Sequence, residues 1–346
     1  MFFKEHTFSI GNKKTKVKFV SKTDLLVFDY KTVLVSFDTN TRKLFPDNIP
    51  VDEIVLEPGE VTKKWESIGD IISQAVEIGA ARDSLFVGVG GGVICDMAAF
   101  AGSIYMRGAE VVLIPTTLLA MADAALGGKT GIDFQGYKNM IGTFFPAMEV
   151  RICIDLLDTL PEREYLSGLA EIIKHGLLRD TKILDILNVK YKEVLARDKD
   201  ILSEIVERSI KVKAWYVEQD AVESGIRAHL NFGHTFGHAL ESVSNFKGFS
   251  HGEAVVWGII KALKTGVEMG VTDSKWLKEV LSLVEKYSYN LETPGELETD
   301  IIITALKKDK KKKGSSVQFV LQKEQGNTFL SPVADELLRE VLKNKI

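Results

Sequence analysis

The first third of the chain alternates short apolar runs with stretches of helical periodicity. Four runs rich in β-branched and aromatic residues predict buried strands, at residues 32–37, 53–56, 84–89 and 111–114. Between these runs, residues 62–78 and 93–106 place apolar side chains at the spacing of one helix face. Strands that alternate with helices are typical of a parallel sheet with crossover helices. The pattern therefore predicts an α/β domain with a mostly parallel, Rossmann-like sheet.

Two further signals mark the ends of this sheet. The turn signal Ile10-Gly11-Asn12 precedes the alternating residues 16–20, which predicts a hairpin added to the sheet. The apolar residues 150–155 predict the last strand, and Pro161 then stands where a helix would begin. The sheet is therefore expected to be complete before Pro161.

The rest of the chain has a different pattern. Helical patterns follow one another almost without a break to about Leu306. Residues 315–321 and 327–330 then predict two short strands. We therefore expect an α/β domain at residues 1–158 and a mainly α-helical domain at residues 159–346.

Composition narrows the class of partner. The 346 residues suit two domains, and a net charge of −4 speaks against nucleic acid as a partner. Any phosphate chemistry then relies on a local cluster of cations. The two cysteines, Cys95 and Cys153, cannot form a disulfide framework or a cysteine zinc cluster, as expected in a reducing cytoplasm. Without a signal-peptide core or an apolar run of membrane length, we expect a cytoplasmic protein with no membrane partner.

A glycine turn is the first candidate site. Gly90, Gly91 and Gly92 lie between the strand at 84–89 and the helix that follows. Such a turn lets the backbone approach a phosphate, which the N-terminus of the helix attracts. A tight turn without a ligand would look the same. Residues 38–40, Asp-Thr-Asn, also follow a strand, where they form either a ribose contact or only a turn.

Histidines form the second candidate site. His234 and His238 are one helical turn apart, so both rings share a face, and His251 follows closely. This spacing suits one divalent metal with a carboxylate from elsewhere in the chain. Alternatively, one histidine is a ligand and the other an acid–base group. The spacing alone leaves the ligand set open.

Two further patterns carry charge. Glu171 and Lys174 lie three residues apart on a predicted helix, among apolar residues. They form either an exposed ion pair or a pair of buried charges, which would need a metal or an anion as a partner. Residues 128–130, Gly-Lys-Thr, are similar to the end of a Walker A motif, but Asp123 occupies the position of its first glycine, which excludes an NTPase. The lysine-rich residues 307–313 suit a solvated loop or a lid over an anion.

Together these segments resemble the dehydroquinate synthase family, in order along most of the chain. The most specific matches are residues 90–96, 105–108, 115–120, 127–131, 170–174, 230–241 and 251–255. The resemblance implies an NAD- and metal-dependent sugar-phosphate cyclase. It selects Glu171, His234 and His251 as ligands of zinc (or cobalt) and makes His238 the acid–base histidine on the phosphate side.

The resemblance also assigns the remaining site residues. The family's NAD site matches positions on both sides of the predicted domain boundary: Asp38, Asn40, Glu60, Lys63, Gly91, Gly92, Val93, Asp96, Thr116, Thr117, Lys138, Thr159, Leu160 and Glu164. Its catalytic and substrate-binding groups match Asp123, Lys129, Asn139, Lys174, Lys213, Arg227, Asn231 and one of Lys310 and Lys311. Arg107 matches an arginine that the family lends to the neighbouring subunit, which implies a homodimer.

The implied reaction converts 3-deoxy-D-arabino-heptulosonate 7-phosphate into 3-dehydroquinate and phosphate, in the shikimate pathway. It combines transient oxidation by NAD, phosphate β-elimination, re-reduction and an intramolecular aldol closure. Asp133 stands where the family has an asparagine, and such changes keep other sugar-phosphate cyclases, of inosose or valiolone type, as alternatives. A metal- and NAD-dependent polyol dehydrogenase and a catalytically silent binding protein are further alternatives.

Overall fold

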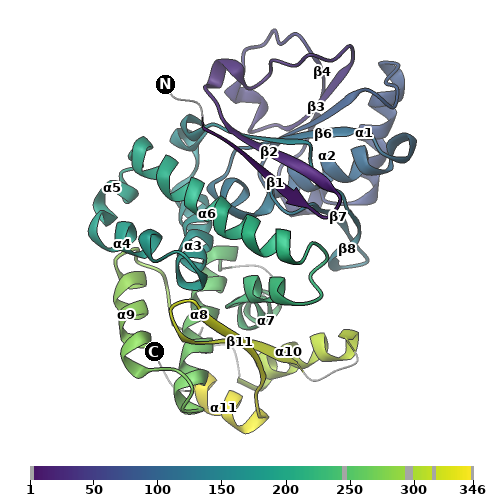
Figure 1. Cartoon of the computed structure of the whole chain (residues 1–346). Coiled ribbons are helices and arrows are strands. Elements are labelled where there is room, and N and C mark those ends of the chain that lie inside the picture. The colour runs from purple at the N-terminus through teal and green to yellow at the C-terminus, as the bar shows by residue number, and fades with distance from the viewer. Residues whose placement is uncertain (1–3, 244–247, 293–298, 314–316, 344–346) are drawn as a thin grey trace. The chain divides into compact units, whose positions relative to one another are not determined.

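The computed structural model describes residues 4–243, 248–292, 299–313 and 317–343, with the backbone alone for residues 308–313. The chain forms two compact units (Figure 1). The first contains Met1–Pro161 and Lys213–Val222, and the second contains Glu162–Val212 and Glu223–Ile346. The last part of one long helix, α6 (Lys199–Gln219), therefore belongs to the first unit.

A seven-stranded sheet forms the centre of the first unit, in the order β1-β2-β9-β6-β5-β3-β4. Its strands are β1 (Glu5–Ile10), β2 (Lys13–Phe19), β3 (Val33–Asp38), β4 (Asp52–Leu56), β5 (Leu85–Gly90), β6 (Glu110–Pro115) and β9 (Glu149–Ile152). Only β1 and β2 pair antiparallel. Every residue of β3 and β5 is buried, as expected for parallel strands covered on both faces. The predicted α/β fold and its added hairpin are confirmed.

Two helices link these strands. They are α1 (Trp65–Glu77) and α2 (Gly92–Ile104), which contact each other, and α2 packs on β5 and β6. Short turns follow several elements: η1 (Lys22–Asp24), η2 (Arg42–Leu44), η3 (Glu60–Thr62), η4 (Tyr105–Arg107), a π-helical turn η5 (Ala120–Ala124) and η6 (Ile154–Thr159). The strand order places β4 on one side of β3 and β5, β6 and β9 on the other. All these strands are parallel, but the order in which the chain adds them reverses between β3 and β5, and α/β proteins bind nucleotides at such a point.

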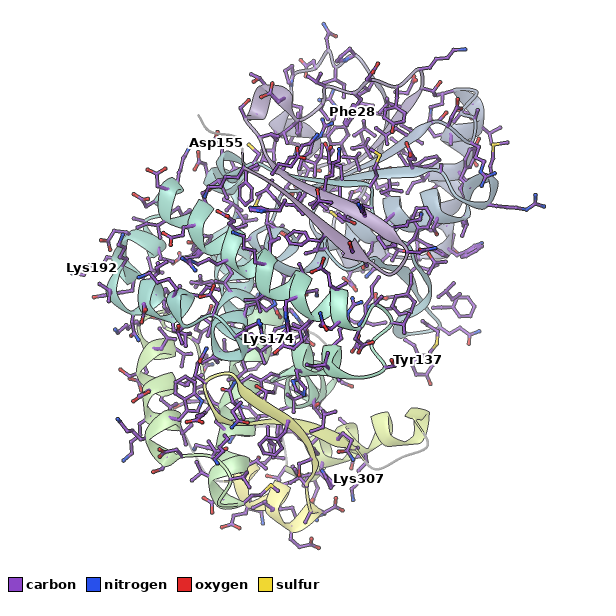
Figure 2. The ribbon with its side chains drawn as sticks, in the orientation of Figure 1. Phe28, Tyr137, Asp155, Lys174, Lys192 and Lys307 are labelled. Carbon is purple, nitrogen blue, oxygen red and sulfur yellow. The ribbon has the colours of Figure 1, made fainter. Side chains whose placement is uncertain are left out.

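One hairpin was not predicted. Strands β7 (Lys129–Phe134) and β8 (Tyr137–Phe144) form a separate two-stranded sheet that packs on α2. Every residue of β8 is at least partly exposed, and the side chain of Tyr137 projects outward (Figure 2). Without a buried face, this segment lacks the apolar alternation by which a strand is recognised.

The second unit is mainly helical. Its helices are α3 (Glu162–Leu178), α4 (Thr181–Val189), α5 (Tyr191–Leu195), the first part of α6, η7 (Ile226–Asn231), α7 (His234–Val243), α8 (His251–Glu268), α9 (Ser274–Glu285), α10 (Thr299–Lys313) and α11 (Asp335–Lys343). The predicted strand pair is present as β10 (Gln318–Glu324) and β11 (Asn327–Pro332). The lysine-rich residues are helical and not a loop, because α10 continues through Lys313, and lysine favours helices. Among the described helices, none has the length and apolar character that crossing a membrane requires.

Candidate metal centre and active site

Three closely packed helices carry the predicted metal ligands of the second unit. Glu171 lies on the buried helix α3, and His234 and His251 are the first residues of α7 and α8. Glycines beside the histidines permit this approach. A Cβ atom at Gly252 would lie 2.4 Å from Cα of Ser167 in α3, and one at Gly258 would lie 2.0 Å from the carbonyl oxygen of Gly233. Backbone therefore packs directly on backbone where the three side chains converge.

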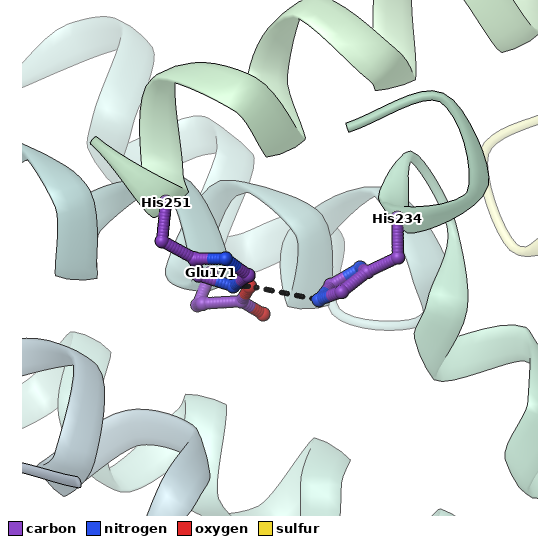
Figure 3. Close-up of side chains that lie close together, drawn as sticks. All are labelled: Glu171, His234 and His251. Carbon is purple, nitrogen blue, oxygen red and sulfur yellow. Dashed lines mark ion pairs between the residues drawn. The ribbon is translucent and has the colours of Figure 1, made fainter. Parts of the chain in front are cut away.

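The three side chains form one cluster (Figure 3). Oε1 of Glu171 lies 3.5 Å from Nε2 of His234 and 3.5 Å from Nε2 of His251. All three atoms lie within 4.8 Å of one another. Two bonds of about 2.1 Å at a tetrahedral angle would separate two zinc ligands by about 3.4 Å. The donor set and its spacing therefore fit one divalent cation.

The cluster combines one buried carboxylate with two partly exposed imidazoles, and charged groups lie close to all three. Glu171 is 1% exposed, and Lys174, one turn further along α3, forms an ion pair with its Oε2. Burial, together with the Lys174 charge, lowers the pKa of His234 well below its usual value, so this imidazole is neutral. Burial also lowers the pKa of His251, but the carboxylates of Glu171 and Glu241 outweigh it and raise the pKa to about 9. A metal ion must displace that proton, because a coordinating imidazole is neutral.

Other predicted residues surround this cluster within the second unit. The His238 ring lies 5.3 Å from the His234 ring and 6.3 Å from the His251 ring, centroid to centroid. Arg227 is buried in η7, and Asn231, at the end of η7, donates to Oε1 of Glu223 at 2.7 Å. Glu164 lies in the first turn of α3. The structure thus places His238, the predicted acid–base histidine, beside the predicted metal ligands.

The predicted nucleotide residues of the first unit gather at the carboxyl ends of adjacent strands. Asp38 ends β3, and its Oδ1 accepts the backbone N–H groups of Asn40 and Thr41 at 2.9 and 2.8 Å. Thr41 donates to the carbonyl oxygen of Val89 at 3.0 Å, which ties this turn to β5. Parallel strands that end together present their loops at one edge of the sheet. The turn at residues 38–41 and the glycine turn therefore lie at the same edge of the sheet.

The glycine turn leads directly into α2. Gly91 is the N-cap of this helix, and no side chain caps it. Gly92 and Val93 begin the first turn, whose N–H groups suit an anion. Thr116 follows β6, and its N–H donates to the carbonyl oxygen of Gly90 at 2.9 Å, while Thr117 is the next residue along. These residues form a backbone cradle.

A buried lysine links this cradle to the unpredicted hairpin. Lys63 is 5% exposed, and its Nζ lies 2.6 Å from Oδ2 of Asp96 and 2.6 Å from Oδ1 of Asn139 in β8. Burial lowers the pKa of Lys63, and the Asp96 carboxylate outweighs this and raises it. Asp133 accepts the N–H of Asn139, whose φ is +50°, at 2.7 Å. Residues predicted to bind cofactor and substrate therefore share one hydrogen-bond network.

Further predicted residues occupy turns and edges of the first unit. Asp123 lies in the π-helical turn η5, a geometry often found at functional sites, and accepts from Nζ of Lys213 at 2.7 Å. Lys129 begins β7, and Arg107 ends η4 with a φ of +68°. The remaining positions are Glu60 in η3, Lys138 in β8, Thr159 in η6, and Leu160 directly after it. The side chains of Lys310 and Lys311 lie outside the described part of the structure.

The sequence interpretation missed Glu241. Its Oε1 lies 3.4 Å from Nδ1 of His251, and its side chain is 8% exposed. A glutamate in an amphipathic helix usually faces solvent, so the residue type alone did not indicate a buried position beside His251. Its position seven residues after His234, on the same face of α7, was the available signal.

The fold also occurs in a solved structure with bound ligands. The chain superposes on 2-deoxy-scyllo-inosose synthase complexed with carbaglucose-6-phosphate, NAD+ and Co2+, with a TM-score of 0.85 at 21% identity, covering 99% of this chain and 100% of that one. The two chains therefore share one fold.

Sequence comparison identifies the family. Residues 53–167 match the N-terminal domain of 3-dehydroquinate synthase, and residues 168–312 match its C-terminal domain. The chain is 38% identical over 302 residues to 3-dehydroquinate synthase of Alkaliphilus metalliredigens, covering 85% of each. It is 39% identical over 319 residues to that of Ruminiclostridium cellulolyticum, covering 92% of this chain and 88% of the relative. The chain belongs to the 3-dehydroquinate synthase family.

Proposed function

We propose that the chain catalyses the conversion of 3-deoxy-D-arabino-heptulosonate 7-phosphate into 3-dehydroquinate and phosphate. The observation that carries this proposal is the convergence of Glu171, His234 and His251 in a chain of this family. When bound, zinc or cobalt polarises a substrate hydroxyl, and NAD accepts a hydride and returns it within one turnover.

The protein's residues have separate tasks in this proposal. Glu171, His234 and His251 hold the cation, and Lys174 forms an ion pair with the buried Glu171 carboxylate. His238, beside the cluster, exchanges a proton on the phosphate side of the substrate. The glycine cradle and Asp38 hold the dinucleotide through backbone N–H groups and the ribose hydroxyls.

Cations neutralise the two anionic ends of the substrate. Lys129 and Asn139 bind the phosphate together with Arg107 and Lys310 or Lys311. Lys213 and Arg227 bind the carboxylate, and the contact between Lys213 and Asp123 fixes the lysine before substrate arrives. Asn231 contributes a further hydrogen bond to the substrate.

One assay tests the reaction. The purified protein receives the heptulosonate phosphate, a divalent metal and NAD+ at much less than the substrate concentration. We expect phosphate release in many turnovers per NAD+ with no net NADH. Stoichiometric NADH would contradict the proposal in favour of a dehydrogenase, and a carbocycle other than 3-dehydroquinate would identify a different cyclase.

We further propose that the chain acts as a homodimer in which Arg107 serves the neighbouring site. Exposed apolar side chains support this: Met106 beside Arg107 is 57% exposed, and Met140 and Phe144 of β8 are 50% and 54% exposed. The hydrogen bond between Thr143 and Ser103, at 2.8 Å, holds β8 against the end of α2 that precedes Met106. Burying such side chains against a second copy is favourable.

Mixed dimers test the role of Arg107. Arg107→Ala is expected to lower kcat/KM about 10- to 100-fold, or roughly 1.4–2.7 kcal/mol, because a charged contact to phosphate is lost. A mixed dimer of Arg107→Ala and His251→Ala contains one complete site only if the arginine crosses the interface. Recovery of about half the wild-type rate supports the proposal. A mixed dimer as inactive as its parents contradicts it, and sedimentation analysis verifies that the dimer has formed.

A further inference from the structure

Both proposed histidine ligands are anchored through the same ring atom. Nδ1 of His234 lies 3.4 Å from the carbonyl oxygen of Phe232, and Nδ1 of His251 lies 3.4 Å from Oε1 of Glu241. An acceptor at Nδ1 keeps a proton there and leaves the lone pair on Nε2. In both rings, Nε2 is the atom that lies 3.5 Å from Oε1 of Glu171. The two rings therefore present the same nitrogen to the same point.

The two anchors differ in kind. For His234 the anchor is backbone two residues earlier in the chain, so it is present once the turn before α7 forms. For His251 the anchor is a side chain of another helix, ten residues away. The His251 side chain is also less enclosed, with 34% exposure against 13% for His234. Packing restrains the His251 ring less, so its orientation depends more on its hydrogen bond.

The sequence of α7 explains how Glu241 reaches this position. His234, His238 and Glu241 lie at i, i+4 and i+7, which is one face of a helix. Glu241 is buried on this face and does not extend into solvent. A buried carboxylate needs a partner, and the imidazole N–H of His251 is such a partner. One helix therefore supplies a ligand for the metal and the support for a ligand on its neighbour.

We propose that Glu241 is a positioning residue that fixes the tautomer and the ring orientation of His251 for metal binding. This inference rests on the proposed metal site. Carboxylates behind metal-binding histidines orient the ring and raise its basicity, and their loss weakens metal binding about 10- to 100-fold. Glu241 does not touch the metal or the substrate in this proposal.

Metal affinity is the direct test. The full-length protein is stripped of metal, and Zn2+ affinity is measured by competition with a chromophoric chelator for wild type, Glu241→Ala and Glu241→Gln. We expect about 10- to 100-fold weaker binding for Glu241→Ala. Glu241→Gln keeps an acceptor for Nδ1–H, so a loss of less than about tenfold is expected, with a shifted visible absorption band of bound Co2+. Unchanged affinity and an unchanged Co2+ spectrum in both variants would overturn the proposal.

A matched control separates orientation from general loosening of α8. Ser250 caps this helix in a capping box with Glu253, next to His251 but without contact to its ring in that motif. Ser250→Ala is expected to lower the Tm and to change Zn2+ affinity by less than about threefold. An equal loss of affinity in Ser250→Ala and Glu241→Ala would reduce Glu241 to a structural role. If the wild-type protein does not bind stoichiometric Zn2+, the proposed metal site is contradicted. If the wild type binds Zn2+ tightly and the Glu241 variants bind it equally well, only the role of Glu241 is contradicted.

Discussion

The histidine cluster of the second unit consists of side-chain atoms. The glycine edge of the first unit, which comprises residues 38–41 and the glycine turn at residues 90–93, consists mainly of backbone atoms. The cluster gathers side-chain donors from three helices, and Glu171 lies 3.5 Å from each histidine. The glycine edge offers mainly backbone: the start of α2 has no side-chain cap, and Asp38 satisfies the N–H groups of its own turn. In the proposed function, the cluster binds a metal through its side-chain atoms, and the glycine edge binds a phosphate in space that the missing side chains leave free.

This difference predicts opposite sensitivities. Removing a side chain from the cluster takes away a ligand while the helices that hold it remain packed. Adding a side chain to the glycine edge fills space that a phosphate needs, although nothing is removed. Substitutions that delete atoms should therefore abolish function in the second unit, and substitutions that add atoms should do so in the first.

The largest effect is expected for His251→Ala. The variant loses one of three proposed ligands, so kcat/KM should fall at least about 1,000-fold, or roughly 4 kcal/mol. The His251 side chain is partly exposed, and the Tm should stay close to that of wild type. Elemental analysis and circular dichroism measure metal content and folding. Full metal content in the variant would remove His251 from the ligand set.

Gly92→Ala gives the complementary test at the glycine edge. A Cβ at Gly92 would meet nothing closer than Ala124, at 3.5 Å, and alanine favours a helix, so stability should be equal or higher. NAD+ affinity should fall about tenfold or more, because the methyl group occupies the approach of the phosphates. Calorimetric titration with NAD+ measures this.

Gly90→Ala is the matched control for the glycine edge. Its Cβ would lie 2.6 Å from Cβ of Ile94, so overpacking should cost about 1–3 kcal/mol of stability. Loss of stability in Gly92→Ala, or unchanged NAD+ affinity, would contradict the proposed backbone cradle.

A smaller effect is expected for Lys63→Met, which breaks the network shared by the cradle and β8. Loss of the Lys63 ammonium leaves the Asp96 carboxylate, whose side chain is 22% exposed, without its lysine partner, at a cost of about 1–3 kcal/mol. The affinity for NAD+ and the KM for the sugar-phosphate substrate should change together, because Lys63 contacts both Asp96 and Asn139. Lys64→Met, at the neighbouring exposed position, is the control. A change confined to one of the two measurements would separate the two sites.

The fold was predictable where burial gives a segment a regular pattern of apolar and polar residues. Strands β3, β5 and β6 are apolar runs, and the β1–β2 hairpin alternates around a glycine turn, so the sequence carried both signals. The β7–β8 hairpin was missed, because its exposed face and its glycines hide the alternation. Its role in holding Asn139 near Lys63 was therefore also invisible.

The ligand set was only partly predictable. Spacing brought His234, His238 and His251 into one region but did not rank them, and the family resemblance selected the pair. In the structure, the Nε2 atoms of His234 and His251 both lie 3.5 Å from one oxygen of Glu171. Glu171 joins them through packing between helices, which local sequence patterns do not encode.

The contact between α7 and α8 affects how substitutions in this protein are interpreted. Gly258 carries no functional group, yet a single methyl group there would collide with the carbonyl of Gly233 and force the two helices apart. His234 and His251 would then separate while both remain chemically intact. A mutational scan scored by turnover alone would therefore rank Gly258 with the two histidines proposed as metal ligands, and only a structural readout would reveal it as a spacer.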